Sequence, residues 1–216
     1  SQRRPIIGGN WKMNTDLASG MNLASCIVDE VQCDIPCDVV LYPSFPYLHT
    51  IERVVSDTNV KLGAQNMWHE SEGAFTGETS GAMLQEVGVT SVLIGHSERR
   101  HILVETDELI AQKVSFGISM NFQIVLCVGE TIEQREEGNT LDVVLSQVTK
   151  GLEEVKAPSM DAIVIAYEPV WAIGTGKTAT PDDAQAVHAS IRQCLEELYD
   201  STIAQQIRIQ YGGSVK

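Results

Sequence analysis

Three side chains able to do acid–base chemistry follow apolar runs of this 216-residue chain, where buried strands would end. Glu168 comes after an apolar run and before a proline, which favours an extended backbone at the glutamate. Apolar neighbours destabilise a carboxylate's charged form and make it a better general base. His96, if neutral, can donate a hydrogen bond to a carbonyl, and Lys12 offers a compact positive charge to a phosphate or an oxyanion. Together the three residues could supply a base, a hydrogen-bond donor and a positive charge to one site.

The segment after Glu168 has the composition of a lid. Apolar residues 170–173 precede Gly174-Thr175-Gly176, and Thr180 with Pro181 is typical of a helix start. Apolar side chains beside glycines suggest a flap that closes over the strand end and excludes water. A P-loop would need glycine where Trp171 stands, and the fit to a dinucleotide-binding glycine motif is poor.

Each of these residues also has an ordinary interpretation. A glutamate before a proline can simply end a strand, a histidine can be structural, and a lysine can extend into water. The double glycine at 212–213 can be a plain turn. The residues alone leave both interpretations open.

Composition restricts the partners. The formal net charge of −14 argues against a nucleic-acid ligand, which requires a basic face. No apolar run reaches the ~18 residues of a membrane span, and the first residues show no signal-peptide pattern. The five scattered cysteines are expected to be reduced, as in a cytoplasmic protein, and Cys33 and Cys37 lack partners for a metal site.

The chain alternates between strand-like and helix-like segments. We expect helices at about 15–32, 44–56, 107–115, 131–137, 141–154 and 181–199, with Thr15, Thr79 and Thr180 as caps, Thr79 opening a further short helix. Seven strands are expected at about 5–14, 38–42, 59–64, 90–95, 121–128, 163–168 and 206–211.

This rhythm predicts a single α/β domain over residues 1–216 with parallel strands and helical crossovers. A doubly wound sheet and a (β/α)8 barrel both fit it. Polar residues recur at the carboxyl ends of the expected strands, where a barrel keeps its active site. The sequence therefore favours the (β/α)8 barrel, also called a TIM barrel.

Several motifs resemble those of one enzyme family. Residues 167–176, YEPVWAIGTG, and residues 95–100, GHSERR, resemble two signatures of the triosephosphate isomerase family. Asn10-x-Lys12, residues 127–130 (CVGE) and residues 212–214 (GGS) resemble further motifs of that family. The resemblance extends over the whole chain.

The resemblance implies an isomerase that interconverts dihydroxyacetone phosphate and glyceraldehyde 3-phosphate through an enediolate, in glycolysis and gluconeogenesis, without cofactor or metal. Glu168 would move the proton between carbons, His96 would serve the two oxygens, and Lys12 and Asn10 would stabilise the negative charge. Gly174, Gly213 and Ser214 would bind the phosphate. Glu130 would anchor the base of the lid.

The resemblance also predicts how copies of the chain associate and how much of the barrel the chain covers. The irregular segment from Gln65 to Thr79 is similar to the family's dimer loop, so we expect a homodimer. The chain covers about seven of the eight β/α units, and we expect the C-terminal part of the barrel to be missing. A truncated, catalytically impaired barrel acting as a binding or structural protein is therefore an alternative, and so is another sugar-phosphate isomerase on the same barrel.

Overall fold

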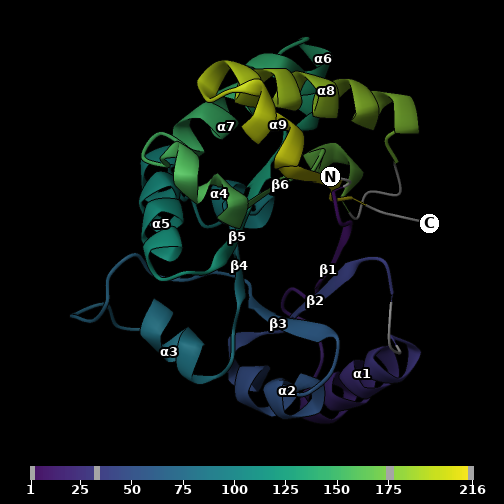
Figure 1. Ribbon diagram of the computed structural model, residues 1–216, viewed down its shortest axis with the longest axis vertical. Helices are drawn as coiled ribbons and strands as arrows, with labels where there is room; N and C mark the ends of the chain where they lie inside the picture. Colours follow the sequence, from purple (N-terminus) through teal and green to yellow (C-terminus); the bar gives the residue numbers. More distant parts are fainter. Residues whose placement is uncertain (1–2, 32–34, 174–177, 214–216) are drawn as a thin grey trace. The chain divides into compact units, whose positions relative to one another are not determined.

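The computed structural model describes residues 3–31, 35–173 and 178–213 (Figure 1). The chain folds into two compact units. The N-terminal unit comprises residues 2–93 and 116–124, and the C-terminal unit comprises residues 94–115 and 125–216. The boundaries run through two strands and one helix, so neither unit is a separate stretch of chain.

The strands follow one another in the sheet in chain order. In the described residues the sheet has seven strands, in the order β1 to β7, and the recorded pairs β1–β2, β2–β3, β3–β4 and β6–β7 are parallel. A doubly wound sheet would extend in both directions from its first strand. The sequential order is that of a (β/α) barrel, which confirms the predicted fold class. The strands are β1 Ile6–Asn10, β2 Asp38–Tyr42, β3 Val60–Ala64, β4 Ser91–Ile94, β5 Gln123–Val128, β6 Ile163–Tyr167 and β7 Arg208–Tyr211.

Helices separate the strands along the chain, as the sequence predicted. They are α1 Leu17–Glu30, α2 Leu48–Val55, α3 Gly81–Glu86, α4 Ser97–His101, α5 Asp107–Ser119, α6 Ile132–Glu136, α7 Thr140–Gly151, α8 Pro181–Leu198 and α9 Ser201–Gln206, with 3-10 turns η1 Phe45–Tyr47, η2 Ala157–Ala162 and η3 Val170–Ala172. The sequence did not predict α9. The predicted α5 ends four residues before the observed helix, and the predicted first strand runs to Asn14, whereas β1 ends at Asn10.

Two predicted helix caps are wrong by one residue. Asp16, not Thr15, caps α1 and forms a reciprocal capping box with Ser19, while Thr15 has a left-handed φ of 71°. Ser80, not Thr79, caps α3 by accepting from the Met83 amide. Adjacent residues of similar cap preference compete, and backbone geometry decides between them. Thr180 caps α8 as predicted.

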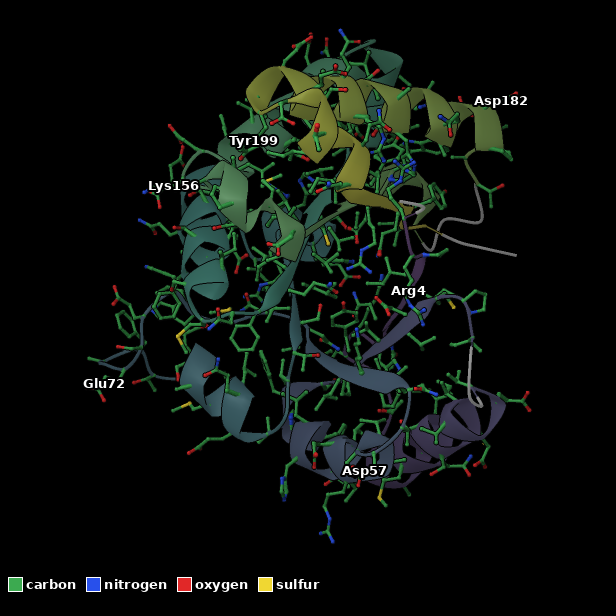
Figure 2. All side chains as sticks on the ribbon, in the orientation of Figure 1. Arg4, Asp57, Glu72, Lys156, Asp182 and Tyr199 are labelled. Atoms are coloured by element: carbon green, nitrogen blue, oxygen red, sulfur yellow. The ribbon has the colours of Figure 1, made fainter. Side chains whose placement is uncertain are left out.

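The core of the N-terminal unit lies between its strands and α1 and α2, which pack side by side (Figure 1). Leu48, Ile51 and Val55 form the buried face of α2 at helical spacing. The Tyr42 ring lies so close to Gly63 that a Cβ there would be 2.2 Å from it. The Tyr42 hydroxyl is 2.9 Å from the Ser91 hydroxyl, which links β2 to β4. Arg4, labelled in Figure 2, pairs with Asp38 where β1 and β2 begin.

The core of the C-terminal unit surrounds β6, all five residues of which are buried. On α8 the buried residues are Val187, Ile191 and Leu195, spaced four apart, and α8 packs beside α7 and α9 (Figure 1). At the end of α8, the Tyr199 hydroxyl donates to the Val155 carbonyl at 2.9 Å (Figure 2). None of the described helices combines the length and apolarity needed to cross a bilayer.

Candidate active site

His96 follows β4 and acts as the N-cap of the short helix α4. Its Nδ1 accepts from the Glu98 amide at 3.3 Å. An acceptor at Nδ1 means that the proton of a neutral imidazole sits on Nε2. The ring is held at the strand end by Gly95, whose φ of 76° turns the chain and whose carbonyl accepts from the Arg100 Nε at 2.7 Å. The helix that His96 caps extends over Ser97–His101.

Glu168 stands at the carboxyl end of β6, and its side chain reaches His96. Glu168 Oε1 lies 3.3 Å from His96 Nε2, and both side chains are at least nine-tenths buried. Glu168 Oε2 accepts from the Ser97 amide at 3.4 Å. The structure thus brings together the two residues that the sequence proposed as base and hydrogen-bond donor. Both contacts are long, so a substrate can replace them at small cost.

The surroundings of Glu168 restrict its position. A Cβ at Gly212 would lie 2.9 Å from the Glu168 Cγ, so only glycine leaves the side chain this space. The Cys127 thiol is buried on the neighbouring strand β5. Burial, together with the nearby Glu168 carboxylate, raises the pKa of Cys127 well above its usual value. The thiol therefore stays neutral beside the carboxylate.

Glu130 joins the end of β5 to the start of the predicted lid. Its buried carboxylate accepts from the Tyr167 hydroxyl at 3.1 Å and from the Trp171 Nε1 at 2.9 Å. Burial and the adjacent Glu130 charge raise the pKa of Tyr167, so the phenol remains a donor. Trp171 lies in η3, directly after Glu168-Pro169. Glu130 therefore holds residues on both sides of Glu168-Pro169, where the sequence predicts the base of a lid.

Arg135 links the two ends of the lid segment. Its guanidinium carbon lies 4.6 Å from the centre of the Trp171 ring, a cation–π contact. Its Nη2 donates to Asp183 at 2.8 Å, and Asp183 also belongs to the capping box of Thr180. Residues 174–177 between these ends, which include Gly174, lie outside the described residues.

Lys12 and Asn10 belong to the N-terminal unit, after and at the end of β1. Lys12 has a left-handed φ of 55°, a conformation that costs a non-glycine residue about 1–3 kcal/mol. Hydrogen bonds hold it there: the Lys12 amide donates to Asn10 Oδ1 at 3.0 Å, and its carbonyl accepts from Gln65 Nε2 at 2.8 Å and Ser44 Oγ at 2.9 Å. Such over-determined strain is typical of functional sites.

The predicted phosphate-binding residues after β7 are described in part. Gly213 is half-buried, and a Cβ there would lie 2.5 Å from the Tyr211 hydroxyl. Ser214 lies outside the described residues. Among the residues that the structure describes, no group of three or more His, Cys, Asp or Glu side chains could hold a metal ion.

Comparison with known proteins decides the family. The sequence profile described as triosephosphate isomerase matches residues 5–216. The chain belongs to the triosephosphate isomerase family. It is 47% identical over 215 residues to the triosephosphate isomerase of Chloroherpeton thalassium, covering 99% of this chain and 85% of that protein. It is 50% identical over 214 residues to the triosephosphate isomerase of Caldanaerobacter subterraneus subsp. tengcongensis, covering 99% of this chain and 86% of that protein.

Three supporting residues escaped the sequence analysis. Gln65 fixes the Lys12 carbonyl, Arg100 joins the Gly95 and Cys127 carbonyls, and Gln147 of α7 binds the peptide of Gly129. Gln147 is 18 residues from its partner and Gln65 is 53 from Lys12. Gln147 fits an ordinary helix, so no local pattern marks it. Gln65 belongs to the polar residues that follow the expected strands, and only its bond to Lys12 was not predicted. Arg100 lies inside the GHSERR motif, which was a signal that could have been used.

Proposed function

We propose that this chain interconverts dihydroxyacetone phosphate and glyceraldehyde 3-phosphate, with Glu168 as the base and His96 as the partner of the substrate oxygens. Membership of the triosephosphate isomerase family supports the reaction. The observation that supports the roles is the buried pair of Glu168 Oε1 and His96 Nε2, 3.3 Å apart at two strand ends. The segment that follows Glu168 is held by a hydrogen bond from Trp171 to Glu130, as the base of a lid would be.

The reaction needs one proton to move between adjacent carbons. Glu168 removes a proton from the carbon beside the carbonyl, and the electron pair of the broken C–H bond forms the C=C bond of an enediolate. The former carbonyl oxygen takes the negative charge, which His96 Nε2–H and Lys12 stabilise. Protonated Glu168 then returns the proton to the neighbouring carbon, which is the former carbonyl carbon. His96 transfers the hydroxyl proton of the other oxygen to the former carbonyl oxygen, so the other oxygen becomes the carbonyl. No electrons leave the substrate.

The remaining groups bind and enclose the substrate. Lys12 and Asn10 provide the positive charge and the amide that face an anionic substrate, while Gly174, Gly213 and Ser214 offer backbone amides and a hydroxyl to the phosphate. A closed lid excludes water from the charged intermediate and so protects it. The substrate is a small phosphorylated triose, and no cofactor takes part.

We also propose a homodimer, formed through the loop from Gln65 to Thr79. Phe75, 38% exposed, packs against Trp68 with ring centres 5.2 Å apart and ring planes tilted by 44°. The Trp68 amide closes the loop by donating to the Thr79 carbonyl at 2.9 Å. A rigid loop that presents an aromatic ring is typical of an interface.

We further propose that residues 1–216 form one barrel domain in the cytoplasm, where the free Cys26, Cys37, Cys127 and Cys194 would stay reduced.

The decisive experiment compares the wild-type chain with Glu168→Gln in an isomerase assay. Gln keeps the size of the side chain but removes the base, so kcat should fall by about 10²–10⁴-fold. Turnover that survives in Glu168→Gln contradicts the assigned base. No turnover in either protein contradicts the proposed reaction and favours the binding-protein alternative. A panel of sugar phosphates distinguishes a related isomerase.

A further inference from the structure

Gly129, the residue after β5, lies directly against the backbone of Glu168. A Cβ built on Gly129 would lie 1.8 Å from the Glu168 carbonyl oxygen and 2.6 Å from its carbonyl carbon. Strand contacts on both sides hold this register, because the Glu168 amide donates to the Val128 carbonyl at 2.7 Å and the Val170 amide to the Glu130 carbonyl at 3.0 Å. Any displacement of the Gly129 peptide is therefore transmitted to the main chain of Glu168.

One side chain satisfies both polar groups of buried Gly129. Gln147 Oε1 accepts from the Gly129 amide at 2.8 Å, and Gln147 Nε2 donates to the Gly129 carbonyl at 3.4 Å. The carbonyls of Val128 and Glu130 point toward β6, so the Gly129 peptide points away from it, as alternation along a strand requires. A buried peptide group needs such partners, and losing one costs about 1–3 kcal/mol.

Gln147 is itself firmly placed. It lies in the last turns of α7, one residue before the buried Val148 and four before Gly151. A Cβ on Gly151 would lie 2.7 Å from a methyl carbon of Leu126, so α7 approaches β5 as closely as a glycine allows. The amide of Gln147 therefore reaches Gly129 from a helix whose distance to the strand is fixed.

We propose that Gln147 is a positioning residue for Glu168 and acts through the Gly129 peptide. This inference rests on the proposed function. The carboxylate of Glu168 contacts His96 at 3.3 Å and the Ser97 amide at 3.4 Å. The position of the Glu168 main chain determines where this carboxylate meets a substrate, and Gln147 fixes the peptide beside that main chain. A misplacement of about 1 Å at a reacting group can cost 10²-fold in rate.

The test is steady-state kinetics of Gln147→Met, which keeps the length and apolar bulk but lacks the amide. We expect kcat to fall by about ten-fold or more with KM changed by less than about three-fold, because Gln147 is proposed to act on the base and not on the phosphate. Gln147→Glu keeps the acceptor for the 2.8 Å bond and should retain most of kcat. Gln147→Asp has the same charge but is too short to reach Gly129, so its kcat should fall as in Gln147→Met.

The matched control is Gln193→Met, at an exposed glutamine of α8 that bonds Glu197 at 3.0 Å, and its kcat should equal that of wild type. A kcat of Gln147→Met within two-fold of wild type, even with a lower Tm, overturns the proposal, as does a change confined to KM. If Gln147→Met does not fold, equal kcat values for Gln147→Glu and Gln147→Asp overturn it. An inactive wild type, or an active Glu168→Gln, contradicts the proposed function instead.

Discussion

At the scale of single residues, the site depends on backbones that approach more closely than any side chain would permit. Gly129 is the clearest case, with the Glu168 carbonyl oxygen where its Cβ would be. Because the obstacle is main chain rather than a flexible side-chain end, Gly129→Ala must push β5 and β6 apart. We expect a loss of about 3 kcal/mol in the free energy of unfolding, measured by urea denaturation, together with reduced activity.

Gly9→Ala is the control for this prediction. A Cβ at Gly9 would make an ordinary contact of 3.4 Å with a Leu41 methyl group, so its stability should change by less than about 1 kcal/mol. Equal losses in the two variants would show that chain flexibility, rather than overlap with Glu168, determines the effect.

A second residue-scale prediction concerns Glu105, whose carboxylate lies 2.5 Å from the buried Lys113 Nζ and 2.8 Å from the Arg99 Nε. Burial raises the pKa of Glu105, but Lys113 and Arg99 more than offset this, and the net pKa is lowered. A lowered folded-state pKa adds stability above the unfolded value of about 4.3 and loses it as pH falls through the folded value. Glu105→Gln should therefore cost about 3–5 kcal/mol near neutral pH.

The same variant should lose less as the pH falls through the lowered folded-state pKa of Glu105, because the wild-type carboxyl is then protonated as well. Urea denaturation at about pH 7 and at a series of pH values below about 4 measures this decline. Glu153→Gln, at an exposed glutamate of the same unit, should show little difference at either pH. A Glu105→Gln effect that is independent of pH would contradict the role of the charge.

At the scale of elements, the start of α8 shows how the lid's second end is fixed. Thr180 Oγ1 accepts from the Asp183 amide at 3.1 Å, and Asp183 also pairs with Arg135. Thr180→Ala should cost about 0.5–2 kcal/mol by removing the cap. Ser190→Ala, at an exposed position within the same helix, should be close to neutral in the same thermal denaturation assay. Equal effects would contradict a capping role.

The elements were predictable where their signals are local. Thr180 followed by Pro181 marked α8 correctly, and the apolar run of β6 ended at Glu168 as the following proline requires. The caps of α1 and α3 were misplaced because Thr15 and Asp16, like Thr79 and Ser80, are both good caps, and only the strained φ at Thr15 separates the first pair. The roles of Gln65 and Gln147 depend on tertiary contacts, which single-sequence patterns do not contain.

At the scale of the whole molecule, the parallel strand order followed from the alternation of strands and helices, and the pairing of His96 with Glu168 followed from their places at strand ends.

The loop at residues 65–79 is predicted to bind a second copy of the chain. Phe75→Ser should yield a monomer at micromolar concentration by analytical ultracentrifugation, because it removes the exposed ring of the loop. Leu198→Ser, equally exposed at the end of α8, should leave sedimentation unchanged.

The charge of the chain predicts how that dimer responds to salt. Each copy carries a formal charge of −14, so two copies repel each other when they associate. The screening length falls from about 30 Å at 0.01 M salt to about 10 Å at 0.1 M, which weakens this repulsion. The dissociation constant of the wild-type dimer, measured by sedimentation at both concentrations, should therefore decrease as salt is added. An increase would mean that opposite charges across the interface outweigh the net repulsion, and that ion pairs rather than Phe75 hold the two copies together.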